Sequence, residues 1–289
     1  MGASTRRLGP LLGCVILAGA CGSSSPTPTS PTLPLSVQYV FAEIAGDVLD
    51  TAFRPVAGVK VEIVDGVRAG TSATSDAEGR FSFTGGQLVD GIRFRATKDG
   101  YISTTVSGPL QFPWPSTVAH LAVILESLAP PVKIEAGDYA LTIIADRACT
   151  DIPVDLRTRT YNATITPAPP SSGIPANTRY NVAVSGPLLS PFGFGIGVAG
   201  SHLRFEIDGP AFVEHVAPFT YLEIAGAGES DVEAATASTL SIPFSGSFTY
   251  CDLKSEMARN NNCYTTPQDQ RISYQQCLSQ NDRMILTRR

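Results

Sequence analysis

The chain has 289 residues, which is enough for two domains with hydrophobic cores of ordinary size. Charged residues make up only 16% of it, and the formal net charge of −5 argues against nucleic acid as a partner. The frequent glycines (26) and prolines (22), together with many Val, Thr, Ile and Phe residues, favour short strands joined by tight turns.

Residues 1–20 have the features of a cleaved export signal. A pair of arginines is followed by the apolar run LGPLLGCVILAGA, which is too short to span a bilayer. The stretch LAGAC at residues 17–21 resembles the lipobox of bacterial lipoproteins, although its leucine lies one place further from the cysteine than in the commonest form. This resemblance implies cleavage after Ala20 and lipidation of Cys21, and Gly22 in the next position implies the outer membrane.

Residues 21–37 contain the stretch GSSSPTPTSPTLP, whose Ser, Pro and Thr residues cannot build a core. We expect an extended, semi-rigid tether between the lipid anchor and the folded part. Cleavage leaves 19 basic and 26 acidic residues and a net charge of −7, which argues against binding to nucleic acid or anionic headgroups.

Residues 38–127 alternate between strand-like runs and turn signals. In GVKVEIVDG the side chains of Val59, Val61 and Ile63 share one face at period two. The runs YVFAEIAGDVLD, RFSFTG, GIRFRAT and TVAHLAVILE continue the pattern, and the DAEG segment supplies a tight turn. Seven short strands without a convincing helix predict a β-sandwich.

The same segment resembles the carboxypeptidase regulatory-like domain. The resemblance rests on the succession GDVLD, RPVAGVKVEIVDG, TSDAEGRFSFTG and IRFRATKDGY. It implies a transthyretin-like sandwich of the carbohydrate-binding-like fold, in which such domains are usually non-catalytic accessory or spacer modules on exported proteins. It transfers no set of active-site residues.

Residues 133–289 continue the all-β pattern through GDYALTIIAD, RTRTYNATITP, TRYNVAVSG, SHLRFEID, FTYLEIAG, STLSIPFSGSFTY and RMILTRR. About eight or nine antiparallel strands are expected, and a closed sheet removes exposed edges. We therefore predict a second antiparallel β-barrel of lipocalin-like size, or a second sandwich. The region is similar to a companion domain that recurs in predicted bacterial lipoproteins and carries no function to transfer.

The segment FGFGIGVAGSHLRFEID contains Gly195, Gly197 and Gly200 in the order of a dinucleotide-binding fingerprint. That fingerprint needs a helix after the glycines. Here the chain continues with the period-two alternation of a strand, so no helix N-terminus can receive a phosphate. The glycines are better explained by sheet curvature or a bulge.

No catalytic or metal-binding constellation is found. The three histidines, His120, His202 and His215, are isolated in sequence, and neither an H-E-x-x-H nor a G-x-S-x-G motif is present. The acidic pair Glu229 and Asp231 falls in GAGESDVEAAT, which we interpret as a solvated hairpin connection. The sequence therefore predicts a protein that is not an enzyme and has no metal or cofactor.

One aromatic segment is a candidate binding surface. Trp114, the only tryptophan, lies between two prolines beside Phe112 in LQFPWPSTV, which places it on a connection of the sandwich. A rigid aromatic side chain on a loop can stack on a sugar ring or anchor a partner. The alternative is that the indole completes the core or packs between the domains.

Four cysteines remain in the exported chain, so disulfides are expected. Cys149 follows the first strand of the second domain, and Cys277 precedes the run RMILTRR. In a closed antiparallel barrel the first and last strands are neighbours, which brings these two cysteines together. Cys251 and Cys263 flank a short polar loop, so we predict the pairs 149–277 and 251–263.

These features favour a non-enzymatic, lipid-anchored outer-membrane protein with a structural or adhesive role, and with carbohydrate or an envelope protein as its partner. The alternative is a lipocalin-like carrier of a small apolar ligand. The small residues of TYLEIAGAG and GFGIGVAG keep that alternative open, because an internal cup needs small inward-facing side chains.

Overall fold

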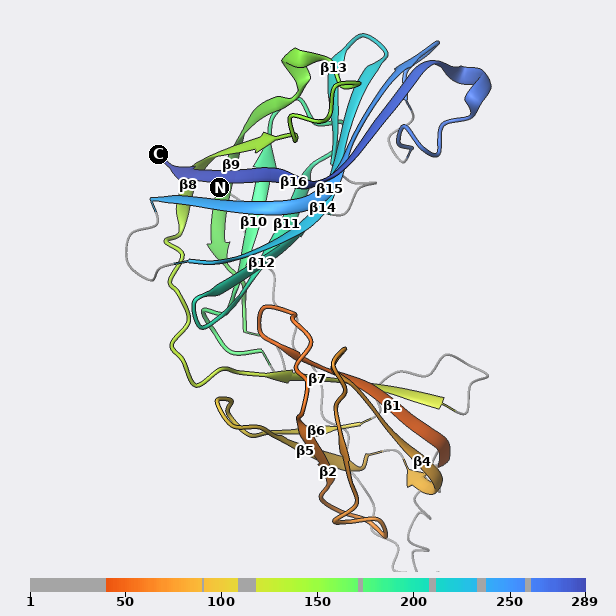
Figure 1. The fold of residues 1–289 in the computed structure, drawn as a ribbon, viewed down its shortest axis with the longest axis vertical. Helices are drawn as coiled ribbons and strands as arrows, with labels where there is room; N and C mark the ends of the chain where they lie inside the picture. Colours follow the sequence, from red (N-terminus) through yellow and green to blue (C-terminus); the bar gives the residue numbers. More distant parts are fainter. Residues whose placement is uncertain are drawn as a thin grey trace, which may run out of the picture. The chain divides into compact units, whose positions relative to one another are not determined.

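The computed structural model describes residues 40–89, 91–108, 118–170, 174–207, 212–232, 238–257 and 261–289. Within these ranges the chain forms strands and two short 3₁₀ turns, η1 (Val154–Leu156) and η3 (Gln268–Gln270), and no α-helix. The prediction of an all-β protein, with a sandwich followed by a barrel, is confirmed (Figure 1).

The first seven strands form two sheets packed face to face. One sheet has the order β4-β1-β7, in which β1 and β7 run parallel, and the other has the order β3-β2-β5-β6. The strands are β1 (Val40–Asp50), β2 (Lys60–Ile63), β3 (Ser72–Thr74), β4 (Arg80–Val89), β5 (Arg93–Thr97), β6 (Thr104–Ser107) and β7 (Val118–Leu125).

Period-two alternation produces the core between these sheets. In β7 the side chains of Ala119, Leu121 and Val123 are buried, while His120 between them is exposed. Ile44 of β1 and Phe94 of β5 meet them from the two sheets, within one hydrophobic cluster. The apolar face predicted for residues 59, 61 and 63 is fully buried in this cluster.

The remaining strands form a single antiparallel sheet of the order β12-β11-β10-β9-β8-β16-β15-β14-β13. A further pairing between β12 and β14 closes eight of these strands into a barrel, with β13 beside the start of β14. The strands are β8 (Gly137–Ile144), β9 (Thr158–Pro167), β10 (Arg179–Ser185), β11 (Phe192–Ala199), β12 (His202–Ile207), β13 (Val213–Ala217), β14 (Thr220–Asp231), β15 (Thr239–Leu253) and β16 (Arg271–Arg288).

Two disulfides join the cysteines in the pairing expected from the sequence. Cys149 is bonded to Cys277, with 5.4 Å between their Cα atoms, and Cys251 is bonded to Cys263, with 5.8 Å between theirs. The first and last barrel strands, β8 and β16, are indeed antiparallel neighbours. One detail of the prediction was wrong: Cys277 lies within the last strand rather than before it, because β16 already begins at Arg271.

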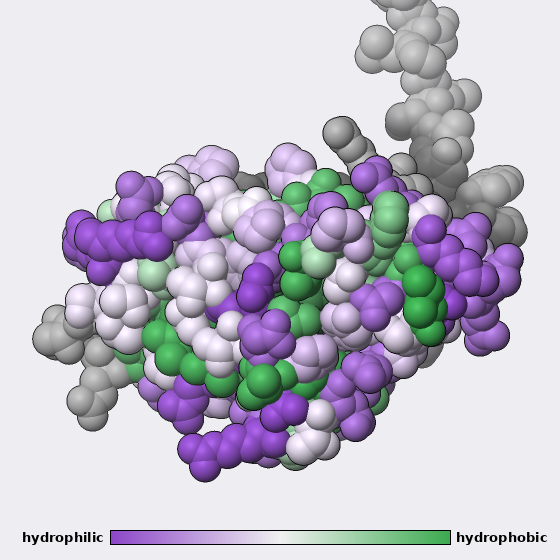
Figure 2. All heavy atoms as spheres, turned by 90° about the horizontal axis from the view of Figure 1, so that it is seen from above, coloured by the Kyte–Doolittle hydropathy of each residue, from purple (hydrophilic) through white to green (hydrophobic). Residues whose placement is uncertain are grey.

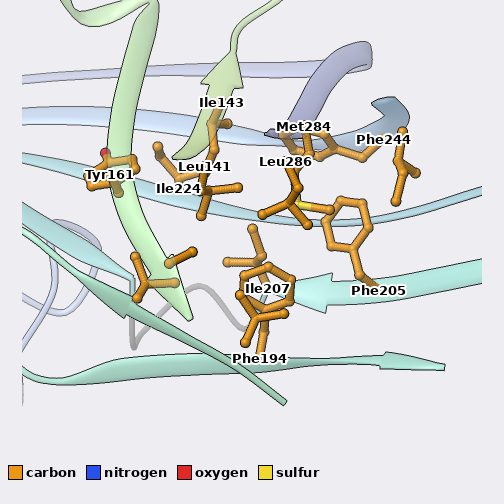
Figure 3. Packing of buried hydrophobic residues seen from close by; sticks show 14 of the residues in the cluster. Leu141, Ile143, Tyr161, Phe194, Phe205, Ile207, Ile224, Phe244, Met284 and Leu286 are labelled. Atoms are coloured by element: carbon orange, nitrogen blue, oxygen red, sulfur yellow. The ribbon is translucent and has the colours of Figure 1, made fainter. Parts of the chain in front are cut away.

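The interior of the barrel is filled with side chains. Figure 3 shows Phe205 and Ile207 pointing toward Leu286 and Met284 from the opposite wall. Successive ring centroids lie 4.9–6.3 Å apart along a continuous row of six aromatic side chains: Tyr161, Phe212, Phe192, Phe194, Phe205 and Phe244. The barrel is therefore packed as a core along this row.

The small residues that suggested an internal cup have another explanation. A Cβ atom added to Gly228 would lie 2.7 Å from the ring of Phe205 and 2.6 Å from the Cβ atom of Phe244. The space left by this glycine is thus already occupied by aromatic side chains of the two neighbouring strands, β12 and β15. Small residues alternate with large ones across the interior, as close packing requires.

The three glycines of FGFGIGVAGSHLRFEID lie in the β11–β12 hairpin, and β12 is the strand predicted after Gly200. Gly200 makes the tight turn with φ +59°, a left-handed conformation that glycine adopts without steric cost. Gly197 has a different role, because a Cβ atom there would lie 2.8 Å from the carbonyl oxygen of Thr51 and 2.9 Å from the Cα atom of Ala52. Gly197 therefore admits the turn between β1 and β2 against the barrel wall.

Polar contacts hold this turn in place. The buried hydroxyl of Thr51 donates to the carbonyl oxygen of Val198 at 2.5 Å, and Arg204 donates through Nη1 to the carbonyl oxygen of Phe53 at 2.9 Å. The guanidinium of Arg179 lies 4.6 Å from the centre of the Phe53 ring, within the range of a cation–π interaction. These three contacts hold the turn of residues 51–53 against the barrel wall.

We expect Gly197→Ala to lower the free energy of unfolding by about 1–3 kcal/mol, since the added methyl group overpacks a backbone contact. Gly195→Ala is the matched control in the same strand, because the nearest atom to its added Cβ would be 3.9 Å away. That control should stay within about 0.5 kcal/mol of the wild type. Urea denaturation measures both, and equal effects of the two substitutions would contradict the close approach at Gly197.

Candidate functional site

Three residues proposed from the sequence lie outside the described residues. Cys21, the predicted lipidation site, falls before residue 40, and Phe112 and Trp114 fall in the range 109–117.

The histidines occupy three different environments. His120 on β7 is exposed, with its Nε2 atom 3.4 Å from a carboxylate oxygen of Asp47. His215 on β13 stacks on Tyr221, with ring planes 16° apart. His202 on β12 is the only one of the three that is buried, and it is held at both ring nitrogens.

The His202 cluster joins the two strands that close the barrel. The Nδ1 atom of His202 lies 3.1 Å from a carboxylate oxygen of Asp231, and the Nε2 atom lies 3.3 Å from one of Glu229. Both acidic residues belong to β14, which pairs with β12 in a register that places Asp231 opposite His202. The cluster thus adds side-chain contacts to the closing seam.

This position corrects the interpretation of GAGESDVEAAT as a solvated connection. Residues 226–231 are the second half of β14, and each pairs with a residue of β12. The first half of this strand was predicted in FTYLEIAG, but the second half was missed because Gly226, Ala227 and Gly228 have low β-propensity. The sequence indicated this half of β14 only through the alternation that places Glu229 and Asp231 on one face.

An open, polar groove lies beside this cluster on the outer surface of the barrel. One part has a volume of about 430 Å³ and is lined by Arg204, Glu229, Ser245 and Gln280, among others. A second part of about 580 Å³ shares Ser245 and Gln280 and extends to Leu278. The small residues 225–228 of β14 and 245–247 of β15 form its floor. We call this feature the polar groove.

The groove offers hydrogen-bonding groups of several kinds on a shallow surface. Hydroxyls come from Ser245, Ser247 and Ser279, an amide from Gln280 and a carboxylate from Glu229. On the face shown in Figure 2, small hydrophobic patches are interspersed with hydrophilic areas. The part that extends to Leu278 also exposes apolar surface, so the groove presents hydrogen-bonding and apolar groups side by side. Within the described parts of the chain, no group of three or more His, Cys, Asp or Glu side chains has the arrangement of a metal site.

A buried ion pair fastens β13 over one end of the barrel. Glu214 has no exposed surface, and both its carboxylate oxygens contact the guanidinium of Arg159 on β9. Tyr161, also on β9, donates its hydroxyl to the same carboxylate at 2.7 Å. Burial and the Glu214 charge raise the pKa of Tyr161 well above its ordinary value. These groups have a structural role, because all of them are engaged with one another.

A second buried carboxylate lies under the loop that the Cys251–Cys263 disulfide fastens. Glu223 of β14 is 8% exposed and accepts a hydrogen bond from the backbone N–H of Cys263 at 3.3 Å. Tyr221, Cys251 and Met257 pack in the small hydrophobic cluster under the same loop. Loss of hydration raises the pKa of Glu223 from its ordinary value of 4.5 to about 7.

Among the described residues, no helix combines the length and the apolar character needed to cross a membrane. No family model and no curated protein matches the chain. Two solved structures show distant similarity at 11% sequence identity. The Bacillus anthracis TIE protein has a TM-score of 0.24, with 83% of this chain and 49% of that protein covered. A variant of BcpA, the major pilin subunit of Bacillus cereus, has a TM-score of 0.23, with 86% and 69% covered. This chain thus spans about half the length of the first protein.

The raised pKa of Glu223 predicts a pH-dependent stability. Between pH 4.5 and 7 the folded state retains a proton that the unfolded state has lost, so stability falls as the pH rises through this range. We expect Glu223→Gln to be close to wild type at pH 4.5 and more stable by up to about 3 kcal/mol at pH 8.

Urea denaturation at the two pH values measures this difference. Glu78→Gln, at an exposed residue, is the control and should leave the pH dependence unchanged. A Glu223→Gln variant that follows the wild type at both pH values would show that the carboxylate is not desolvated.

Proposed function

We propose that this chain is a non-enzymatic lipoprotein anchored in a bacterial outer membrane, where it has a structural or adhesive role and binds carbohydrate or another envelope component. The lipobox-like LAGAC and the tether of residues 21–37 support the anchor. The resemblance of residues 38–127 to the carboxypeptidase regulatory-like domain supports an accessory role. Two disulfides are consistent with export to an oxidising compartment.

The filled barrel interior is the observation that carries this proposal. A carrier of a small apolar ligand needs an internal cavity, and here six aromatic rings in mutual contact occupy that space. The lipocalin-like alternative is therefore disfavoured. Recognition is left to the outer surface, where the polar groove presents hydroxyl, amide and carboxylate groups.

The proposal of a non-enzymatic role rests on the contacts that the buried polar side chains already make. Both ring nitrogens of His202 are held by carboxylates, which leaves neither free to activate a nucleophile. The carboxylate of Glu214 likewise accepts hydrogen bonds from Arg159 and Tyr161. A binding function, in contrast, uses groups that are exposed, such as Gln280 and Ser245.

The anchor is tested by mass spectrometry of the native protein. We expect an N-terminal Cys21 that carries diacylglycerol, and Cys21→Ser should leave the protein unlipidated and released from membranes by a high-salt wash. An N-terminus elsewhere, or membrane association that survives Cys21→Ser, would contradict the proposed anchor.

The binding surface is tested on a glycan array with the full mature protein. We expect Gln280→Ala together with Ser247→Ala to weaken binding at least tenfold, because each removes a hydrogen bond without touching the core. Gln268→Ala, at an exposed residue outside the groove, is the matched control. If Trp114→Ala abolishes binding while the groove variants do not, recognition belongs to the Phe112–Trp114 segment instead. A wild type that binds no glycan and no envelope extract would refute the binding role.

A further inference from the structure

The two disulfides of the barrel are nested in the sequence. The bond between Cys251 and Cys263 spans 12 positions, and the bond between Cys149 and Cys277 spans 128 positions and encloses the first. Cys263 is therefore 12 positions from its native partner and 14 positions from Cys277. Proximity in the sequence hardly distinguishes the right partner of Cys263 from the wrong one.

Loop-closure entropy gives the unfolded chain little preference for the native bonds. The probability of closing a loop falls roughly as its length to the power 3/2, so Cys263 meets Cys251 only about 1.3 times as often as it meets Cys277. Cys251 and Cys277 are 26 positions apart, and with this pair included about half of the first bonds are non-native. Cys149 then pairs with whichever cysteine remains, so both bonds of such a molecule are wrong.

A molecule with two wrong bonds contains no thiol that can correct them. Disulfides exchange only when a thiolate attacks one of the two sulfur atoms. All four cysteines of the barrel are then oxidised. The other two cysteines of the chain are expected to be lost or modified, since Cys14 lies in the export signal and Cys21 is the predicted lipidation site. The attacking thiolate must therefore come from another molecule.

Non-covalent contacts of the folded barrel define the native partner of Cys149. Asp146 accepts hydrogen bonds from the Ser279 hydroxyl at 2.9 Å and from the Asn281 amide at 3.0 Å. These contacts hold the segment of Cys149 beside that of Cys277. Folding therefore selects the long bond, which loop-closure entropy alone disfavours.

The β15–β16 hairpin excludes one of the wrong bonds. Its register places Cys251 opposite Tyr274 and Cys277 opposite Phe248, so the two cysteines are three pairs apart along the ladder. Three positions of a strand correspond to about 10 Å, and the two side chains project from opposite faces. A disulfide needs Cα atoms closer than about 7 Å. A chain that joins Cys251 to Cys277 therefore cannot form this hairpin.

Burial protects the native bonds once they have formed. Cys149 is 1% exposed, and Cys251 and Cys263 have no exposed surface. A thiolate must reach a sulfur atom in order to attack it, so the folded barrel shields its bonds, whereas a mispaired chain that cannot fold leaves its bonds open to attack. Repeated exchange therefore leads to the native pairs.

We propose that this chain is a substrate of a thiol–disulfide isomerase, which converts the pairs 149–251 and 263–277 into the native pairs. The isomerase thiolate attacks the sulfur atom of Cys263, forms a mixed disulfide and releases Cys277 as a thiolate. Cys277 attacks Cys149, which forms the native long bond and releases Cys251. The Cys251 thiolate then attacks Cys263 in the mixed disulfide, and the isomerase thiolate leaves. Two disulfides are present before and after, so the exchange needs no oxidant.

The test uses the full chain with Cys14→Ser and Cys21→Ser, which makes it independent of the proposed lipid anchor. The reduced, unfolded protein is diluted from urea into two equivalents of the oxidant diamide, and peptide mapping under non-reducing conditions identifies the bonds. We expect about half of the molecules to carry non-native pairs. A purified, reduced isomerase of the Cys-X-X-Cys type should lower this fraction at least tenfold, whereas the same enzyme with both active-site cysteines replaced by serine should not.

Cys149→Ser combined with Cys277→Ser, in the same background, is the matched control because it leaves only one possible bond. This variant should form the 251–263 bond equally with and without the isomerase. Native pairing of all molecules by diamide alone would overturn the proposal, because it would show that folding orients the thiols before they are oxidised. Non-native pairs that the active isomerase leaves unchanged would overturn it as well.

Discussion

Pairing of the first and last strands of the barrel is the constraint on which the rest of the second domain depends. Six residues of β16, 283–288, align with residues 139–144 of β8, and this register brings Cys277 within bonding distance of Cys149. It also buries Asp282, whose carboxylate accepts the N–H of Asp146 at 2.8 Å and so fixes the point at which the chain leaves β8. A disulfide that closes so long a loop gives close to the largest stabilisation of its kind, about 5 kcal/mol in the chain-entropy description.

Closure at the other seam, between β12 and β14, depends on small residues that lie opposite large ones in the neighbouring strand. β14 reaches β12 only because Gly228 leaves space for the rings of Phe205 and Phe244, and β11 accepts the Thr51 turn only because Gly197 has no side chain. Small residues have different consequences on the two faces of the sheet. Inside, aromatic rings occupy the space, and outside, the small residues of β14 and β15 leave the polar groove open.

Much of this architecture could be predicted because it depends on local periodicity and on topology. The alternation in GVKVEIVDG identified its buried face, and the rule that the ends of a closed barrel are neighbours was enough to pair four cysteines. The filled interior could not be predicted, since it depends on which aromatic side chain faces which glycine across strands distant in sequence. The His202 cluster was missed for the same reason: His202 and Asp231 are 29 residues apart and meet only through the β12–β14 register.

The strands that meet at the β8 seam differ in length. β16 has 18 residues and β15 has 15, whereas β8 has 8, so closure at the β8 seam uses only the last third of β16. The remaining residues must project beyond the barrel, where one face is covered by the disulfide-fastened loop over Glu223. Residues 145–149, which follow β8, lie beside the next part of β16, since Asp146 accepts hydrogen bonds from Ser279 and Asn281 and Cys149 is bonded to Cys277. The Cys149–Cys277 disulfide therefore extends the closure of the barrel past the end of β8.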